Sequence, residues 1–130
     1  MILDTSAILT IVFGETGNEA FVDAIATAPS CRVSAASLLE VSIVAESRGG
    51  DLGVRQCDSF FRNSRVSVDP VTEEHALLAR QGYSDFGKGR HPAGLNFGDC
   101  FSYALAKATG EPLLFKGADF RQTDVRPALP

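Results

Sequence analysis

Four acidic side chains occupy positions where an isolated negative charge is unfavourable or needs a partner. They are Asp4, Glu40, Asp99 and Asp119. Asp4 directly follows the short apolar run 1–3, which we expect to be a strand. Asp119 lies in the loop after a second expected strand at 111–115. The carboxyl ends of parallel strands meet at one edge of a sheet, so both acids should lie at that edge.

The other two acids belong to expected helices. Glu40 is the only charged residue between Val33 and Ala45, in a stretch so rich in apolar residues that we expect its helix to be buried on nearly all sides. A buried, unpaired carboxylate is costly unless it takes up a proton or finds a cation or a hydrogen-bond donor. Asp99 is expected at the first turn of a helix that runs to Thr109, where the helix dipole favours an anion.

Carboxylates gathered at one place favour a divalent metal. Two of them about 4 Å apart repel by roughly 4 kcal/mol at an effective dielectric constant near 20, so a cluster of four needs a strong positive charge. Hard oxygen ligands suit Mg²⁺ or Mn²⁺. Each acid also has a structural interpretation: Asp4 and Asp99 as helix N-caps, Asp119 as a loop acid and Glu40 as a hydrogen-bonded structural glutamate.

The order of elements predicts an α/β fold with a central parallel sheet covered on both faces. Expected strands cover 1–3, 31–33, 65–68, 111–115 and, as a short last strand, 125–128. Expected helices cover about 17–28, 35–47, 51–61, 72–86 and 99–109, and another begins after Asp4. Thr16 and Glu19 resemble a capping box for the first of these, and Gly49–Gly50 should end the helix at 35–47.

Composition narrows the class of protein. The 130 residues are 45% apolar and 22% charged, which suits a single domain over 1–130. A net charge of -4 argues against binding nucleic acid by a basic patch alone, but not against a metal-assisted phosphodiester enzyme. The three cysteines form no CxxC pair and are expected to be buried, reduced thiols. With no basic leader and no long apolar segment, we expect a cytoplasmic protein without a membrane partner.

One glycine-rich loop concentrates basic residues in this acidic protein. Lys88 and Arg90, with His91 beside them, are candidates for contact with RNA phosphates, and the alternative is a solvated loop. The segment 82–88 matches the first seven positions of a P-loop, but Gly89 stands where Ser or Thr must hold Mg²⁺, so nucleotide hydrolysis is not expected. Lys116 is placed either to neutralise the acids or to meet phosphate.

Four local motifs together resemble the PIN-domain ribonucleases, and more closely the VapC toxins of bacterial toxin-antitoxin modules. The motifs are Leu3-Asp4-Thr5-Ser6-Ala7, Ser37-Leu38-Leu39-Glu40, Leu95-Asn96-Phe97-Gly98-Asp99-Cys100 and Leu114-Phe115-Lys116-Gly117-Ala118-Asp119-Phe120. The resemblance spans almost the whole chain, from Ile2 to Asp124. The order of the four acidic motifs makes it specific, although any one of them alone would be weak.

The resemblance implies a three-layer α/β/α PIN-like domain and a Mg²⁺-dependent endoribonuclease. It matches Asp4 and Asp99 to the principal metal ligands and Glu40 and Asp119 to the other catalytic acids. It places Thr5 and Ser6 at a hydroxyl position near the metal, and we expect Ser6 to contact substrate together with Lys88 and Arg90. Asn96 corresponds to a polar neighbour. Relatives often carry Asn at the position of Ala118.

The expected reaction is hydrolysis of an RNA phosphodiester bond by a metal-activated water, with Glu40 as proton acceptor or outer-shell metal ligand. The resemblance further implies a cognate VapB-like antitoxin that presents a basic residue to the acids, and a homodimer. Two alternatives stay open: a carboxylate-Mg²⁺ phosphatase-like enzyme, and a non-enzymatic module whose acidic groove binds a partner. Internal RNA cuts that need Mg²⁺, phosphate release from small esters, or neither would separate the three.

Overall fold

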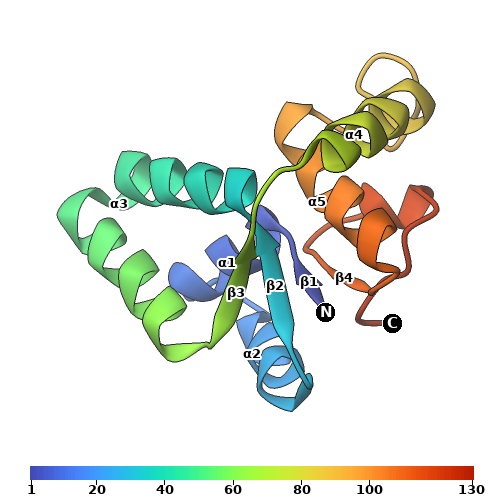
Figure 1. Ribbon diagram of the computed structural model, residues 1–130. Coiled ribbons are helices and arrows are strands. Elements are labelled where there is room, and N and C mark those ends of the chain that lie inside the picture. The colour runs from blue at the N-terminus through green and yellow to red at the C-terminus, as the bar shows by residue number, and fades with distance from the viewer.

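The computed structural model describes all 130 residues and contains a four-stranded parallel sheet (Figure 1). The strands are β1 (Ile2–Leu3), β2 (Cys31–Ser34), β3 (Val66–Asp69) and β4 (Leu113–Leu114). Their order across the sheet is β3-β2-β1-β4, and each neighbouring pair is parallel. The predicted parallel sheet is therefore confirmed.

Helices cover both faces of this sheet. They are α1 (Thr5–Val12), α2 (Asn18–Thr27), α3 (Ala35–Asn63), α4 (Glu73–Phe86) and α5 (Phe97–Thr109), followed by the 3-10 turn η1 (Phe120–Gln122). In Figure 1, α1, α2 and α3 lie on one side of the strands and α4 and α5 on the other. The predicted three-layer α/β/α architecture is confirmed by this arrangement.

The two short central strands divide the core into two parts. Ile2 and Leu113 pack with α5 in one cluster, whereas Leu3 and Leu114 pack with α1 and α3 in the other. All four side chains are completely or almost completely buried. Successive residues of a strand point to opposite faces, so two residues per strand are enough to anchor both helical layers. Each such side chain contributes about 1.5–3 kcal/mol by leaving water.

α4 and α5 pack closely because of a glycine. A Cβ atom built on Gly82 would lie 2.5 Å from a ring carbon of Tyr103, a distance that real Cβ atoms do not show. Tyr103 is buried at the centre of this layer. Gly82, the first residue of the P-loop-like segment, is therefore a packing residue between two helices, which agrees with the rejection of a nucleotide-binding loop.

α3 departs from one expectation. The break predicted at Gly49–Gly50 is present, because Gly50 adopts φ 58 and ψ −146 within the helix. The expectation that the first half is buried on nearly all sides is wrong: Leu39 is 61% exposed and Ile43 57% exposed. Only the inner side, with Val41 and Ala45, packs on the core, and no neighbouring element covers the outer side.

Three local predictions also need correction. No side chain caps α2, which begins after Gly17 in the left-handed conformation, so the Thr16 capping box does not form. α5 begins at Phe97 rather than Asp99, because Asn96 is its N-cap. The expected last strand is reduced to an isolated bridge between Leu113 and Pro127.

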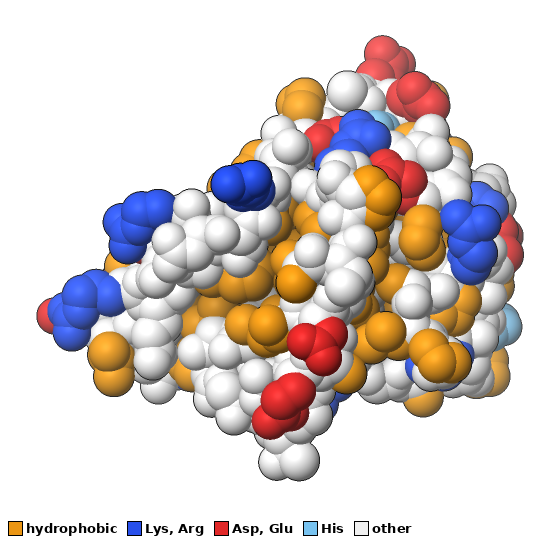
Figure 2. Space-filling model, turned by 90° about the horizontal axis from the view of Figure 1, so that it is seen from below, with side chains coloured by type: hydrophobic (Ala, Val, Ile, Leu, Met, Phe, Trp, Pro, Cys, Tyr) orange, Lys and Arg blue, Asp and Glu red, His pale blue; other side chains and the backbone are white.

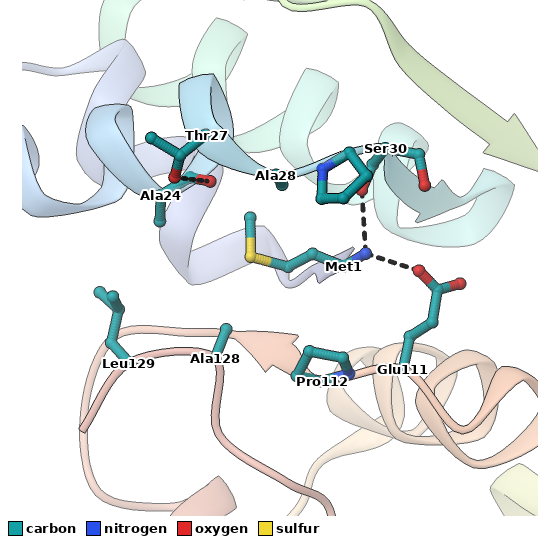
Figure 3. Close-up of a pocket in the computed structure, with 10 residues that line it drawn as sticks. Met1, Ala24, Thr27, Ala28, Ser30, Glu111, Pro112, Ala128 and Leu129 are labelled. Atoms are coloured by element: carbon teal, nitrogen blue, oxygen red, sulfur yellow. Dashed lines mark hydrogen bonds and ion pairs between the residues drawn. The ribbon is translucent and has the colours of Figure 1, made fainter.

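The amino-terminal edge of the sheet holds paired charges. The Met1 ammonium donates to the Ser30 carbonyl at 2.9 Å and to the Glu111 carboxylate at 2.6 Å, beside a hollow of about 470 Å³ (Figure 3). Arg32 of β2 bonds the other Glu111 oxygen at 3.0 Å and also pairs, through two nitrogens, with Asp69 at the carboxyl end of β3. Seen from this side in Figure 2, hydrophobic side chains gather near the middle of the face.

The remaining sequence-based points concern cysteines and membranes. Cys31, Cys57 and Cys100 are free and buried, as expected. Burial raises the pKa of each of these thiols, which keeps them protonated. None of the helices combines the length and the apolar character that crossing a lipid bilayer requires.

Candidate active site

Asp4 lies at the carboxyl end of β1 and caps α1. Its Oδ2 atom accepts from the Ser6 amide at 3.0 Å and from the Ser6 hydroxyl at 2.6 Å. The residue is only 3% exposed, yet no hydrogen bond within the protein reaches its Oδ1 atom. The N-cap interpretation of Asp4 is therefore confirmed for one carboxylate oxygen, and the other oxygen stays available.

Glu40 projects from the first half of α3 toward the start of α1 and α5. The Thr5 hydroxyl donates to its Oε1 atom at 2.7 Å. Its carboxylate lies against the backbone of Gly98, where an added Cβ atom would come within 2.2 Å of Oε2. Two elements distant in sequence thus orient this side chain. The helix leaves Glu40 partly exposed rather than buried.

Asp99 occupies the first turn of α5. Its carboxylate accepts from the Asn96 amide at 3.0 Å, and the Asn96 side chain accepts from the Asp99 amide at 2.9 Å, which completes a capping box. Burial, together with the charges of Asp4, Glu40 and Asp119, raises the pKa of Asp99 to about 6, although the Asn96 hydrogen bond opposes the rise. The charges of Asp4, Glu40 and Asp119 all act on Asp99, so the four carboxyl groups lie in one region of the molecule.

Asp119 comes from the loop after β4 and is exposed at the start of η1. Its side chain makes no capping hydrogen bond there. Its charge nevertheless acts on Asp99. The structure therefore brings all four predicted acids, Asp4, Glu40, Asp99 and Asp119, to the carboxyl edge of the sheet.

No basic side chain compensates these acids. The structure contains five ion pairs, and none includes any of the four carboxylates. The Lys116 ammonium pairs with Glu15 at 2.7 Å, so it does not take the first of its two predicted roles, pairing with the four acids. Its amide instead donates to the Ser6 hydroxyl at 3.0 Å, which ties the loop after β4 to the start of α1.

The donor set suits a divalent cation, although the carboxylates are not drawn into a finished coordination shell. No three His, Cys, Asp or Glu side chains are close enough to hold a metal ion together. Like charges repel, and each of Asp4, Glu40 and Asp99 is turned toward a local donor. Oxygen-only donors with uncompensated negative charge and a free Asp4 Oδ1 atom fit Mg²⁺ or Mn²⁺.

The three predicted substrate-binding residues separate into two places. The Ser6 hydroxyl is engaged on both sides, donating to Asp4 and accepting from Lys116, so it positions the site from within. Lys88 and Arg90 are exposed in the loop between α4 and α5. Hydrogen bonds of 2.9–3.0 Å between Lys88 and Leu95 and within the loop close its backbone. Lys88 and Arg90 line a hollow together with Asn96, the N-cap of the helix that carries Asp99.

Gly98 is a site residue that the sequence reasoning did not single out. Its lack of a side chain admits the Glu40 carboxylate to the start of α5. It stood within the motif Leu95–Cys100, so a signal was present. The reason for a glycine is visible only in the folded structure. Glu40 and Gly98 are 58 positions apart in the sequence and come from different helices.

Comparisons with known proteins agree with this arrangement. The family model of the PIN domain matches residues 1–126. Ribonuclease VapC28 of Mycobacterium tuberculosis is 52% identical over 130 residues, covering 99% of this chain and 98% of that protein. Ribonuclease VapC of Mycolicibacterium smegmatis is 50% identical over 125 residues, covering 96% of this chain and 97% of that protein.

Solved structures share the fold at much lower identity. Mycobacterium tuberculosis VapC20, a toxin that cleaves the sarcin-ricin loop, superposes with a TM-score of 0.74 at 20% identity, covering 97% of this chain and 98% of that one. VapBC2 from Rickettsia felis, bound to promoter DNA, gives 0.76 at 12% identity, covering 97% and 95%. The extent of the family match and the identity to curated relatives show that this chain belongs to the VapC ribonuclease family of PIN-domain proteins.

Proposed function

We propose that this protein is the toxin of a VapBC-type toxin-antitoxin pair and cleaves RNA internally with Mg²⁺, for which Mn²⁺ can substitute. Membership of the VapC ribonuclease family supports hydrolysis of RNA. One observation carries the metal dependence: four carboxylates meet at one edge of the sheet, and no ion pair compensates any of them.

Asp4 and Asp99 would hold the metal directly, with Asp119 beside them. Asp4 keeps an oxygen without a protein partner, and Asp99 has a carboxyl group whose raised pKa a cation would lower again. A bound Mg²⁺ supplies charge neutralisation and a water of lowered pKa. The protein's own contribution is to hold the acids on the ends of β1, α5 and β4.

Glu40 is the residue that would take the proton from the attacking water. In hydrolysis the water oxygen bonds to phosphorus, the bond from phosphorus to the leaving sugar oxygen breaks, and a proton passes to that oxygen. Thr5 orients the carboxylate without charging or neutralising it. Glu40→Gln separates a proton acceptor from an outer-shell ligand. If Glu40 is the proton acceptor, the variant should lose the acidic limb of the pH-rate profile. If Glu40 is an outer-shell metal ligand, the variant should need more Mg²⁺ and keep the pH-rate profile unchanged.

Lys88 and Arg90 would contact RNA phosphates beside the acids. Both are exposed, and neither forms an ion pair. Because such contacts release counterions, each one lost should make binding to single-stranded RNA less dependent on salt, by about 0.7 in the logarithmic slope. Lys88→Gln and Arg90→Gln test this. An unchanged slope in the double variant would remove both residues from the RNA-binding surface.

A VapB-like antitoxin would cover the apolar side chains that flank the acids. Leu39 and Ile43 stand one turn apart on α3 next to Glu40 and are largely exposed. Solved relatives include a toxin-antitoxin complex from Klebsiella pneumoniae, with a TM-score of 0.67 at 18% identity. An arginine of the antitoxin facing the carboxylates would complement their charge. Leu39→Ser should weaken the complex, measured by calorimetry with the cognate VapB-like antitoxin.

A homodimer is also proposed, and light scattering of the purified protein tests it.

The activity itself is tested by incubating the protein with RNA and Mg²⁺, Mn²⁺ or EDTA. We expect internal cuts only with metal, and none with Asp4→Ala or Asp99→Ala. Full cleavage by both variants would reveal a contaminating nuclease, and phosphate release from small esters without RNA cleavage would favour a phosphatase.

A further inference from the structure

A hollow between α4 and α5 differs in charge from the rest of this acidic protein. Its volume is about 850 Å³, within the range of roughly 300–1,000 Å³ typical of ligand sites. Three cations, Arg80, Lys88 and Arg90, line it, and no acidic residue does. The whole chain has a net charge of -4. The hollow therefore presents a locally positive surface to an anionic ligand.

The three cations are available for such a ligand. Arg80, Lys88 and Arg90 are exposed, and none takes part in the ion pairs of the structure. The guanidinium of Arg90 lies 5.7 Å from the centroid of the Tyr83 ring. The Tyr83 hydroxyl donates to the Lys88 carbonyl at 3.4 Å. The loop and α4 thus hold the charges beside an aromatic wall.

Exposed aromatic rings form the other part of the lining. Phe97 is 81% exposed, although phenylalanine is normally buried. It packs edge-on against Phe101, with ring centroids 5.0 Å apart and planes at 87°. Tyr83 is 40% exposed across the hollow, and the buried Ala79 and Cys100 lie beneath. Most of the Phe97 side chain is therefore presented to solvent, and Phe101 is its aromatic partner.

The hollow adjoins the acidic site through α5. Asn96 lines the hollow and exchanges two hydrogen bonds with Asp99, and Phe97 follows it directly. Asn96 therefore borders both places, and an RNA strand held at the carboxylates would have the hollow next to it. Sequence motifs alone do not show this continuity, because Arg80 and Phe97 come from different helices.

We propose that this hollow is a nucleotide subsite in which Phe97 stacks on an unpaired base of the RNA and Arg80, with Lys88 and Arg90, contacts the adjoining phosphates. The inference rests on the proposed function, of which it names a subsite. Aromatic faces between basic side chains are the usual means of binding single strands. A basic segment of an antitoxin would be repelled by the same three charges, so the observations favour RNA as the occupant.

The test measures binding without catalysis. Fluorescein-labelled oligoadenylate and an abasic oligonucleotide with the same sugar-phosphate backbone are titrated with the protein in EDTA and followed by anisotropy. We expect the protein to bind oligoadenylate about tenfold more tightly than the abasic strand. Phe97→Leu should abolish this preference, because leucine keeps the apolar contact but not the ring. Arg80→Gln should weaken both complexes equally and reduce their salt dependence.

Matched controls come from the same helical layer and from a distant surface. Leu77 is 58% exposed on α4 outside the hollow, and Arg62 is exposed near the end of α3. Leu77→Ala and Arg62→Gln should leave both affinities unchanged. Circular dichroism verifies folding of Phe97→Leu, whose site is already exposed.

Several results would overturn the subsite. One is equal binding of oligoadenylate and the abasic strand by the unaltered protein. Another is an undiminished preference for oligoadenylate in Phe97→Leu. A third is unchanged RNA binding in Phe97→Leu together with a change from dimer to monomer in light scattering. The last result would assign Phe97 to an interface between two copies. If the preference is present and depends on Phe97 but RNA is not cut with Mg²⁺, the proposed nuclease function fails while the subsite stands.

Discussion

The two edges of the sheet treat carboxylates in opposite ways. At the amino-terminal edge, the Glu111 carboxylate bonds both the Met1 ammonium and Arg32. At the carboxyl edge, Asp4 and Asp99 have only hydrogen-bond donors from neighbouring polar groups. Compensated charge stabilises the fold, whereas uncompensated charge at one place is tolerable only if a cation arrives from outside.

The pKa values follow the same division. The hydrogen bond from the Met1 ammonium, aided by Arg32 and opposed by burial, lowers the pKa of Glu111. Burial and three neighbouring acids raise the pKa of Asp99. One edge therefore favours the ionised carboxylate and the other disfavours it. Perturbation by burial and like charge is what a site prepared for chemistry shows.

The largest expected effect comes from exchanging an acid at each edge for its amide. Asp4→Asn should reduce RNA cleavage at least about 100-fold, because a metal-holding oxygen is lost, while asparagine still caps α1. Glu111→Gln should leave cleavage unchanged and lower the free energy of unfolding. The measurements are initial rates with Mg²⁺ and urea denaturation. Full activity of Asp4→Asn would break the division between the two edges.

A smaller effect is expected from filling the space against which Glu40 lies. Gly98→Ala should reduce cleavage about tenfold or more, because the new Cβ atom displaces the Glu40 carboxylate. The stability should change little, since alanine suits a helix and the displaced group is the flexible end of a side chain.

Gly49→Ala is the matched control for this substitution, because its Cβ atom meets the Phe13 ring at 3.2 Å, away from the acids. It should leave the rate unchanged. If Gly98→Ala and Glu40→Gln reduce the rate independently, so that their effects multiply in the double variant, the contact between Glu40 and Gly98 has no role in positioning.

The pH dependence of stability should differ between the edges. Asp99 has its pKa raised to about 6 in the folded state, so its ionisation opposes folding. In metal-free protein this group should therefore lower the free energy of unfolding as the pH rises from about 4 to 7, by up to about 2 kcal/mol with allowance for solvent screening.

Asp99→Asn should remove that loss, as measured by denaturation at several pH values in EDTA. Glu111, whose pKa is lowered, should act with the opposite sign: it stabilises above its ordinary pKa, and this contribution is lost as the pH falls through the lowered value. If the free energy of unfolding of Asp99→Asn changes with pH in parallel with that of the unaltered protein, the assignment of opposite signs to the two edges is contradicted.

The smallest expected effect concerns the two ion pairs of Arg32. Arg32→Gln removes one cation from between Asp69 and Glu111, and a partly exposed pair of this kind contributes about 1 kcal/mol. The melting temperature should fall by a few degrees, and kcat and KM for RNA should not change. A loss of activity comparable to that of Asp4→Asn would show that the two edges are not independent.

The sequence was most informative where short-range chemistry decides the structure. Apolar runs interrupted by helical segments predicted four of the strands and the parallel sheet, and Gly49–Gly50 predicted the break in α3. The sequence wrongly predicted that Leu39 and Ile43 are buried. An apolar helix indicates that its surface is more stable when covered, but it does not indicate which element covers it. The capping of α5 by Asn96 was missed by three positions, since Asp and Asn are equally good caps.

By itself, the sequence determined the fold class, the identity of the four acids and the family resemblance, because these depend on residue types and their order along the chain. Tertiary structure alone decided that Thr5 and Gly98 position Glu40, that Lys116 turns to Glu15, and that α4 and α5 enclose a basic, aromatic hollow. These features join residues far apart in sequence, and only the packing of helices on the sheet sets the distances between them.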